Sequence, residues 1–600
     1  MLIEALWPYP AWRAGQYEIA RRVYASSMEG RHLLVSYPTG AGKTAAVLTG
    51  ALAASLEGGF KILYIVRTKS QFQAPRRELR LLAERVKLSA VFLQNKRDLC
   101  LIRGAKLLPY DEFLNFCSEL TRSGLCPYYQ NARLVEPPEG LLDHSALISL
   151  ASEHRACPYE VARKSLRGAR VIVAAYNYVF DPQIRKVFLD DLGVGLGDAL
   201  LVVDEAHNLP HSVAGILSKE ISERALRAAR REVARTIKRP DLERDLYALA
   251  ALLRKLRGLV AEGSEREVSV DDLRESLPNV AELSKLVPLV ERSLGRASLL
   301  RRLVAFLQVL ELGRPEYAVA VRVEGGEVKL TAHCISPSKA TAPLFAEVRS
   351  AVLASGTMPP KRYLASLLGL EERRVDEVRL PSPWAANIGV VVVKGVTSRY
   401  VERGEATYEA MSRFINGLYE RLPSGVCLII APSYDMAKAL RPYLRVKPLV
   451  VEREDTRLDE VEEAAQRYSK LAVLGVAWGK LVEGIELKRG GRSLVRLIIV
   501  AGLPVPEPNV LNRRLVEVLR HRLGSSEEAW RLVYMVPAAV KVAQAIGRSV
   551  RSEGDKSAVA ILDERALEPE VRQQLDELGY AVRAAESLEE VLGALEGFML

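Results

Sequence analysis

Long apolar runs, internal repeats and low-complexity tracts are all missing from this sequence. One of its most continuous apolar runs, Leu497 to Gly502, is far shorter than the about 20 residues that a membrane-spanning helix needs. The residues Met1 to Glu4 lack the basic segment and the following apolar stretch of a signal peptide. We therefore expect a cytoplasmic protein with no membrane partner.

Cysteine is scarce, with 6 residues in a chain of 600. Four of them lie near one another in the sequence: Cys100, Cys117, Cys126 and Cys157. A reducing cytoplasm disfavours disulfides, so this grouping predicts a metal site. The spacing C-x2-C is missing, which disfavours a zinc ribbon, while iron–sulfur clusters also take four thiolates. The spacing alone leaves iron–sulfur, zinc and free buried thiols open.

The size and charge of the chain limit the classes of protein to which it can belong. A chain of 600 residues is too long for one hydrophobic core, which predicts several domains. Hydrophobic residues make up 49% and charged residues 26%, as in ordinary globular proteins. The net charge of +11 favours a polyanionic partner, with a merely basic enzyme as the alternative.

Short apolar runs followed by helical patterns occur in two separate groups, which predicts an α/β fold with two parallel-sheet domains. The early group includes residues 62–66, 171–175 and 200–203, and the late group includes 427–430, 473–476, 497–500 and 558–562. We expect the first domain to comprise residues 1–92, 161–210 and 316–380, with a hairpin over 317–333, and the second to comprise 381–600. The cysteine segment 93–160 and a helical segment 211–315 interrupt the first domain.

The run Thr39-Gly40-Ala41-Gly42-Lys43-Thr44 follows a predicted strand and opens a predicted helix. In a phosphate-binding loop the glycines allow backbone N–H groups to wrap the phosphates. The lysine reaches the β- and γ-phosphates, and the hydroxyl holds Mg²⁺. This sequence therefore predicts an ATP site.

Two acids, Asp204 and Glu205, follow the apolar run 200–203 and precede Ala206 and His207. A carboxylate at the end of a strand can hold Mg²⁺ and an attacking water. We expect Asp204 to be the Mg²⁺ partner and Glu205 to be the base that orients the water.

The segment from Gln544 to Arg551 carries Gln544, Arg548 and Arg551 at the end of the second α/β domain. The two arginines are three residues apart and share one face of a helix. Arginines in such a position can reach a γ-phosphate across a cleft. We expect all three residues to act in ATP hydrolysis.

Together these segments resemble a superfamily 2 helicase, and specifically the xeroderma pigmentosum group D (XPD) family. The resemblance covers nearly the whole chain: Arg13 and Gln16 resemble the adenine-side motif, and further matching segments are 38–44, 66–71, 175–178, 204–209, 354–358, 431–434, 479–486 and 544–551. One departure is Glu486, where the family usually has Asp; the position is still expected to contact the nucleotide.

The resemblance implies two RecA-like motor domains, with an iron–sulfur insertion and an arch-like helical insertion in the first. It also implies ATP-driven 5′ to 3′ movement on single-stranded DNA and unwinding of the duplex, with DNA repair as the setting. The four cysteines are then the ligands of a [4Fe–4S] cluster. A monomeric archaeal protein, related to DinG-type helicases, is expected on single-stranded and forked DNA, with loading factors for repair or transcription as further partners.

Single-strand tracks combine basic residues with stacking aromatics. The candidates for DNA contacts are Arg67, Thr68, Lys69 and Ser70, together with Tyr176 and Tyr178 after the next strand.

Three other functions compete with a DNA helicase. One is a DNA-binding protein that senses damage or redox state and whose ATP turnover only gates binding, and another is an RNA helicase. A metabolic P-loop kinase is the third, although it would lack the second α/β domain.

Overall fold

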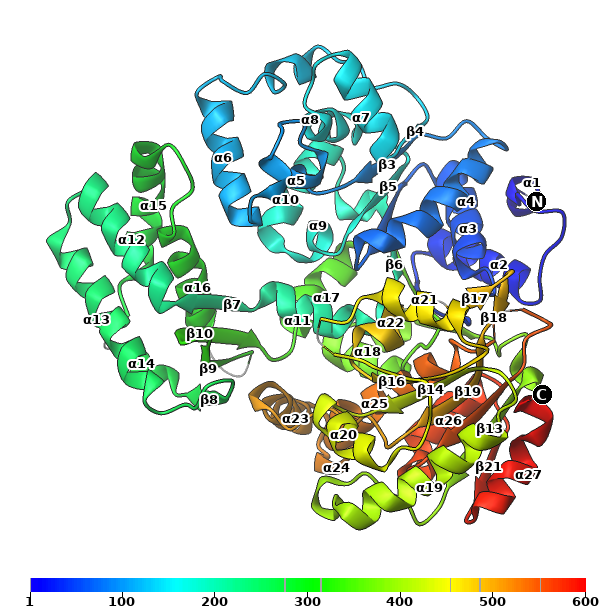
Figure 1. The fold of residues 1–600 in the computed structure, drawn as a ribbon. Coiled ribbons are helices and arrows are strands. Elements are labelled where there is room, and N and C mark those ends of the chain that lie inside the picture. The colour runs from blue at the N-terminus through cyan, green and yellow to red at the C-terminus, as the bar shows by residue number, and fades with distance from the viewer. Residues whose placement is uncertain are drawn as a thin grey trace.

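The computed structural model describes residues 2–274, 277–312, 316–453, 455–484, 487–550 and 552–599 (Figure 1). Its first sheet has eight strands in the order β12-β1-β11-β6-β2-β5-β3-β4, and every neighbouring pair is parallel. The strands are β1 (His32–Ser36), β2 (Lys61–Val66), β3 (Ala90–Leu93), β4 (Leu141–Leu142), β5 (Val171–Ala175), β6 (Ala199–Asp204), β11 (Ser350–Ser355) and β12 (Val375–Arg379).

Strand residues of the first sheet alternate between two hydrophobic cores, because neighbouring side chains of a strand point to opposite faces. Helices α1 (Leu2–Leu6), α2 (Gln16–Glu29), α3 (Lys43–Gly58) and α4 (Gln73–Ala83) bury one face. The other face is covered by α7 (His144–Glu153), α8 (Pro158–Ser165), α9 (Asn177–Phe180), α10 (Pro182–Leu192), α11 (Leu209–Leu217), α17 (Ser338–Glu347) and α18 (Lys361–Leu368).

The second sheet has seven parallel strands in the order β15-β16-β14-β19-β20-β13-β21. They are β13 (Ile388–Val393), β14 (Gly425–Ala431), β15 (Leu449–Val451), β16 (Lys470–Val476), β19 (Val495–Val500), β20 (Ser557–Ile561) and β21 (Val582–Ala585). One face packs against α21 (Leu458–Arg467), α22 (Lys480–Gly484), α25 (Val536–Ile546) and α26 (Pro569–Glu577), and the other against α19 (Glu405–Arg421), α20 (Tyr434–Leu440) and α27 (Leu588–Met599). The expected α/β fold with two parallel sheets is confirmed.

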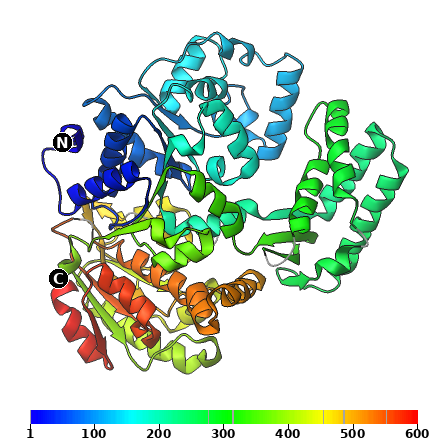
Figure 2. The same cartoon turned by 180° about the vertical axis from the view of Figure 1, so that it is seen from behind.

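We call the eight-stranded sheet with its helices the first unit, and the seven-stranded sheet with its helices the second unit. A helical lobe interrupts the first unit after α11 and lies at one side of the molecule, away from both chain termini (Figures 1 and 2). It contains α12 (Glu223–Thr236), α13 (Pro240–Arg257), α14 (Val270–Arg274), α15 (Val280–Leu294) and α16 (Leu300–Leu312). Its antiparallel sheet has the order β7-β10-β9-β8 and consists of β7 (Lys219–Ser222), β8 (Glu265–Val268), β9 (Tyr317–Glu324) and β10 (Glu327–Cys334). The expected hairpin is therefore present, but it pairs inside the lobe and not with the eight-stranded sheet.

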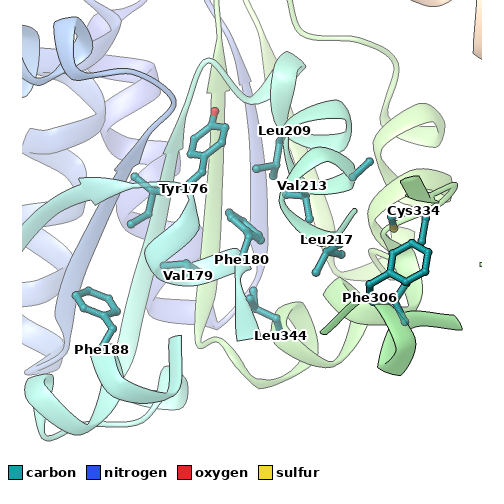
Figure 3. Close-up of a cluster of buried hydrophobic side chains, with 14 of the residues drawn as sticks. Tyr176, Val179, Phe180, Phe188, Leu209, Val213, Leu217, Phe306, Cys334 and Leu344 are labelled. Atoms are coloured by element: carbon teal, nitrogen blue, oxygen red, sulfur yellow. The ribbon is translucent and has the colours of Figure 1, made fainter. Parts of the chain in front are cut away.

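One hydrophobic core runs without a break from the first sheet into this lobe. Figure 3 shows Phe180 and Leu209 of the first unit on one side and Phe306 and Cys334 of the lobe on the other, with Leu217 between them. Because close-packed interiors transmit strain, we expect the lobe to move together with the first unit.

Segment 93–160 contains the four grouped cysteines and mostly short helices. Besides α7 and α8 these are α5 (Lys96–Leu99) and α6 (Tyr110–Arg122). Across the described ranges of the chain, no helix has the length and apolar character needed to cross a membrane.

Candidate active site

Functional side chains gather where parallel strands of the first sheet end. The loop 37–42 follows β1, the pair Asp204 and Glu205 ends β6, Arg67 follows β2, and Ser355 ends β11. Because β1, β11, β6 and β2 are neighbours in the sheet, their carboxyl ends bring these residues to one edge. This edge is the usual ligand site of an open parallel sheet.

The loop between β1 and α3 is shaped to receive phosphate groups. Gly40 and Gly42 have φ angles of 85° and 91°, a left-handed conformation that other residues adopt at a cost. Lys43 begins α3 with a buried side chain whose Nζ makes no hydrogen bond within the described ranges, and its ion-pair partner Glu205 Oε1 is 3.9 Å away. A buried ammonium that lacks hydrogen bonds indicates a site that a bound anion completes.

Arg13 and Gln16, which precede β1, hold this loop by hydrogen bonds to its backbone carbonyls. Gln16 Nε2 donates a hydrogen bond to Ala41 O at 3.1 Å, and Gln16 Oε1 accepts one from Arg13 N at 2.8 Å. Arg13 Nη1 also reaches Gly40 O at 3.4 Å. A Cβ on Gly42 would collide with the Gln16 amide, and the φ of 91° disfavours any residue with a side chain, so glycine suits this position best. A cavity of about 1040 Å³ opens here, lined among others by Tyr9, Trp12, Arg13, Gln16, Thr39, Gly40, Gly42, Lys43, Thr44, Asp204 and Glu205.

The acids that end β6 differ in their electrostatic surroundings. Burial raises the pKa of Asp204 to about 6, against the lowering effect of Lys43. Burial also acts to raise the pKa of Glu205, but nearby cations, Lys43 first among them, outweigh it and hold that pKa below its ordinary value. Glu205 has a φ of 51°, an uncommon conformation for a residue with a side chain and one that often marks a functional position. Glu205 therefore stays charged beside the loop lysine.

His207 connects the two α/β units. Burial lowers its pKa to about 4, so the imidazole is neutral at physiological pH. Its Nδ1 lies 2.6 Å from Ser355 Oγ and 3.2 Å from Glu205 Oε2, and its Nε2 contacts Gln544 Nε2 on α25 of the second unit. A neutral ring can thus donate from Nδ1 and accept at Nε2, which joins Glu205 to the second unit through one side chain.

Of the remaining predicted residues of the second unit, the structure describes one. Arg548, two residues after the end of α25, lies close enough to Glu205 to lower the pKa of its carboxyl. Arg551 and Glu486 lie outside the described residues.

A second cavity, of about 680 Å³, lies between the two units. Its lining includes Arg67 and His207 from the first unit and Tyr434, Trp478 and Lys541 from the second. This cavity, which we call the groove between the units, therefore borders His207, and no residue of the loop 37–42 is among its lining.

The predicted DNA contacts fall into exposed and buried groups. Thr68, Lys69 and Ser70 are exposed, and a capping box with Gln71 holds their backbone. Lys69 forms an ion pair with Asp98.

The two tyrosines are placed differently. Tyr176 is 3% exposed, and its hydroxyl donates to Asp204 O. Tyr178 is half-buried, with its hydroxyl 3.4 Å from Gln94 O. The ring of Tyr176 supports the end of β6 and has no face open for a base.

The four grouped cysteines come from separate elements and line one small cavity. Cys100 follows α5, Cys117 lies in α6, Cys126 follows α6, and Cys157 precedes α8. Burial raises the pKa of the Cys157 thiol to about 11. Within the described residues, no three His, Cys, Asp or Glu side chains form a group suited to a single metal ion.

Two further residues of the site, Tyr64 and Lys541, were not named from the sequence, and Ser355 was named only within the matching segment 354–358, without a role. Tyr64 is buried inside β2, where its hydroxyl interacts with Thr44 and Asp204, and nothing in an apolar strand run distinguishes it. Ser355 ends β11, and Lys541 is 5% exposed in α25. Lys541 could have been found from the sequence, because it is the single charged residue in the helix Val536–Ile546, in which Gln544 is the one other polar residue.

Comparison with known protein families gives three matches. The DEAD_2 family model matches residues 64–226, the helicase C-terminal domain model matches 416–578, and the DEAD/DEAH box helicase model matches 17–103.

Two known proteins are similar over most of the chain. The ATP-dependent DNA helicase XPD of Sulfolobus acidocaldarius is 27% identical, over 88% of this chain and 91% of that protein. The ATP-dependent DNA helicase chl-1 of Caenorhabditis elegans is 22% identical, over 86% of this chain and 74% of that protein. A solved structure titled "XPD_Helicase" has a TM-score of 0.68 at 23% identity and covers 96% of this chain and all of its own.

Proposed function

We propose, from the premise that this chain is an XPD-like helicase, that it uses ATP to move 5′ to 3′ along single-stranded DNA and unwind the duplex ahead. The observation that carries the motor part is the contact of His207 with Gln544, because it ties the hydrolytic edge of the first sheet to the second unit. Relative movement of the two units is then linked to the state of the nucleotide. DNA repair is the proposed setting.

ATP occupies the cavity beside the loop 37–42 in this proposal. Backbone N–H groups of the loop and the Lys43 ammonium bind the phosphates, and Arg13 and Gln16 hold the loop in shape. The chemistry of the donors fits Mg²⁺: a Thr44 hydroxyl and an Asp204 carboxylate are oxygen ligands. When bound, Mg²⁺ neutralises charge on the β- and γ-phosphates.

Glu205 orients the attacking water, since its lowered pKa keeps it charged next to Lys43. Arg548 of the second unit supplies the positive charge that stabilises the transition state at the γ-phosphate. Gln544 contacts His207 and so links the second unit to the hydrolytic edge of the first sheet. Arg551 is proposed to act in ATP hydrolysis with Arg548, and Glu486 to contact the nucleotide, as expected from the sequence.

Single-stranded DNA follows the exposed turn Thr68 to Ser70 and the groove between the units. Arg67 lies both next to this turn and in the groove lining, so it joins the two parts of the track. Phosphate contacts by such residues are independent of base sequence. Tyr178 stays a weaker candidate and Tyr176 is not carried forward, because its ring is buried.

The four cysteines are proposed to hold a [4Fe–4S] cluster. Four thiols that line one small cavity match the four thiolate ligands that a [4Fe–4S] cluster would take. When bound, the cluster supplies metal–thiolate bonds that hold a segment with little apolar core. Cys100, Cys117, Cys126 and Cys157 thereby fix α5, α6 and α8 relative to one another.

The organisation of the chain is proposed as two motor units, the cysteine segment and the helical lobe. The strand pairing favours extending the lobe through the hairpin β9–β10, to about residue 334, because β10 pairs with β7 and β9 pairs with β8. By similarity to the archaeal relative, we also propose that the protein is archaeal and acts in the cytoplasm as a monomer. Its proposed partners are forked DNA and loading factors.

One experiment tests the main claims together. The protein is purified without oxygen, its iron is counted, and unwinding is followed on duplexes with a 5′ or a 3′ single-stranded tail. We expect about four irons per chain, as a [4Fe–4S] cluster requires, and unwinding of the 5′-tailed duplex only. Lys43→Ala is the matched control and should abolish ATP hydrolysis. Zinc in place of iron, or hydrolysis without unwinding of either duplex, would contradict the proposal.

A further inference from the structure

We infer that Trp478 is a stacking platform for a base of the single strand in the groove between the two units. This inference rests on the proposed function, because it needs single-stranded DNA in the groove, and it assigns that DNA a contact for which Trp478 was not predicted. Trp478 follows β16, lines the groove and leaves 47% of its surface exposed. A tryptophan that open to solvent is uncommon and indicates a binding surface.

The backbone that carries Trp478 is held from inside. Glu452, which is 3% exposed, accepts a hydrogen bond from Val476 N at 2.8 Å on one carboxylate oxygen and from Leu481 N at 3.0 Å on the other. A Cβ on Gly479 would collide with this carboxylate, so the loop closes tightly over Glu452. The position of Trp478 is therefore fixed on both sides while its ring stays open, and a preorganised ring loses little freedom on binding.

A cation lies under one face of the ring. Lys541 Nζ is 4.5 Å from the centroid of the Trp478 ring, a cation–π distance. Lys541 belongs to α25, three residues before Gln544, and it is close enough to His207 to lower the pKa of that imidazole. Since one face of the ring covers the ammonium, the other face is available for a base. A base stacked there would be separated from Lys541 only by the Trp478 ring. Lys541 belongs to α25, the helix whose Gln544 contacts His207 at the hydrolytic edge of the first sheet.

The mixture of charge and aromatic surface in the groove favours a single-stranded nucleic acid. Its lining has three cations from three elements, Arg67 after β2, Lys541 in α25 and Arg403 in the loop before α19. Two carboxylates, Asp435 and Glu507, also line it, so the groove keeps a small positive excess. Trp478 and Tyr434 provide aromatic surface in the same lining. Basic side chains interleaved with aromatics bind the backbone and the bases of a single strand without regard to sequence.

The first test compares affinities for a fluorescein-labelled oligo(dT), measured by anisotropy. Trp478→Ala should weaken binding by about 5- to 140-fold, because base–aromatic stacking contributes ~1–3 kcal/mol per base and 1.4 kcal/mol is a factor of ten. Trp478→Phe, which keeps an aromatic face, should recover most of this affinity. Tyr468→Ala is the matched control, because Tyr468 is 42% exposed at the opposite end of β16 and should bind as the wild type does.

The second test uses intrinsic fluorescence and does not depend on a loss of affinity. Oligo(dT) should quench tryptophan emission in the wild type and in Tyr468→Ala, and most of this quenching should disappear in Trp478→Phe. Wild-type affinity in Trp478→Ala, or unchanged quenching in Trp478→Phe, would overturn the inference while the wild type still binds and unwinds DNA. A wild type that neither binds oligo(dT) nor unwinds a tailed duplex would overturn the proposed function and this inference with it.

Discussion

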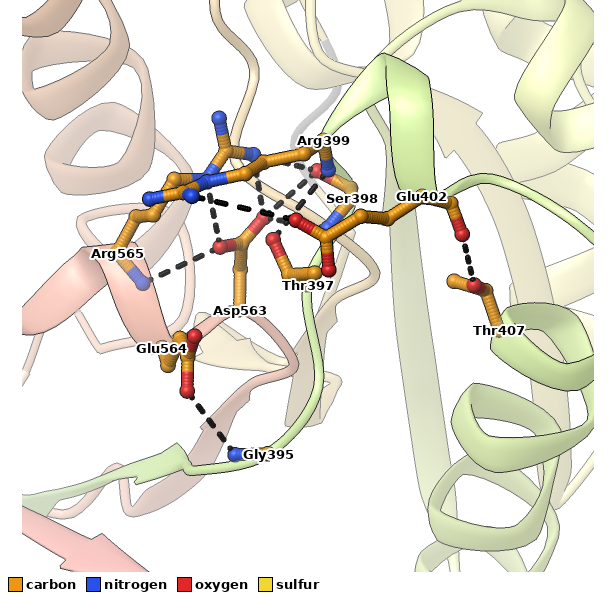
Figure 4. A network of polar contacts seen from close by, with 9 residues as sticks. All are labelled: Gly395, Thr397, Ser398, Arg399, Glu402, Thr407, Asp563, Glu564 and Arg565. Atoms are coloured by element: carbon orange, nitrogen blue, oxygen red, sulfur yellow. Dashed lines mark hydrogen bonds and ion pairs between the residues drawn. The ribbon is translucent and has the colours of Figure 1, made fainter.

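Asp563 shows how one buried carboxylate can organise several loops of the second unit (Figure 4). It is fully buried after β20 and accepts hydrogen bonds from Ser398 N, Ser398 Oγ and Leu503 N, at 3.0, 2.6 and 3.0 Å. Arg565 Nη2 lies 2.7 Å from the same carboxylate. These bonds hold the loop that carries Arg403 to the groove, so stability and groove geometry depend on the same residue.

Asp563→Asn should lower the stability of the second unit by about 3 kcal/mol at pH 7, since it leaves Arg565, whose side chain is only 13% exposed, without its charge partner. Burial acts to raise the pKa of Asp563, but Arg565 and the hydrogen bonds hold it below its ordinary value of 3.8. A lowered pKa in the folded state stabilises above pH 3.8, and this contribution is lost as the pH falls through the folded-state pKa. Urea unfolding at pH 7 and near pH 3 should show the gap between wild type and variant narrowing in acid.

Glu586→Gln serves as the control, because Glu586 is 72% exposed and its ion pair with Lys394 should contribute little. An equal gap at both pH values would contradict the role given to the Asp563 charge.

Sequence predicts single residues well where the chemistry is local. Lys43, Asp204 and Glu205 lie where expected because a loop or a strand end places them whatever the rest of the fold does. Tyr176 follows a strand in the same way, but its burial depends on α9 and the end of β6, and a sequence pattern does not contain that contact. Glu452 was missed because its partners, Val476 and Leu481, lie more than twenty residues away.

At the scale of elements, α23 (Val510–Leu523) connects parts of the chain that are distant in sequence. Its residues Val510 and Val518 pack against Ala318 and Ala320 of β9, and Leu519 packs in one cluster with Leu367 of α18. Arg514 also reaches Glu267 of β8, with Nη2 2.6 Å from Oε1. Movement of the second unit would thus be felt directly by the sheet of the helical lobe.

Reversing the Arg514–Glu267 pair tests this connection. Arg514→Glu and Glu267→Arg should each increase amide hydrogen exchange in β8 and β9, because each places two like charges together. The double variant restores opposite charges and should recover most of the protection, with a coupling free energy of about 1 kcal/mol for such a half-exposed pair. A double variant that exchanges faster than both single variants would show that α23 does not hold the lobe through this pair.

Elements were predictable where the pattern is long and apolar, as in the two parallel sheets. The strands β7 (KEIS) and β8 (EREV) were not predicted, because both are short and polar and become strands only by pairing with β10 and β9. Strand preference depends on such neighbours more than helix preference does. The hairpin β9–β10 was recognised, but its partners, and so its place in the lobe, depend on contacts between distant parts of the chain.

At the scale of the whole molecule, the cavity lined by the four cysteines and the cavity beside the loop 37–42 are separate, because they share no lining residue. None of the four cysteines lines the nucleotide cavity or the groove between the units. The helical lobe lies on the side of the molecule away from α2 and α3 (Figures 1 and 2), and none of its described residues lines the cavity beside the loop 37–42. ATP hydrolysis and strand separation should therefore depend on different parts of the chain.

Cys126→Ser tests this division. The variant should lose its iron and its unwinding of 5′-tailed duplex, since a segment with little apolar core relies on metal–thiolate bonds for its shape. It should keep much more of its DNA-stimulated ATP hydrolysis, because the cavity around Lys43 does not include the cysteine segment. Cys334→Ser is the matched control: Cys334 is a buried core residue of β10, so this variant should retain both iron and unwinding. Full unwinding by an iron-free Cys126→Ser protein would mean that the cysteine segment does not separate the strands, and equal loss of hydrolysis and unwinding would mean that the two activities are not divided between these parts.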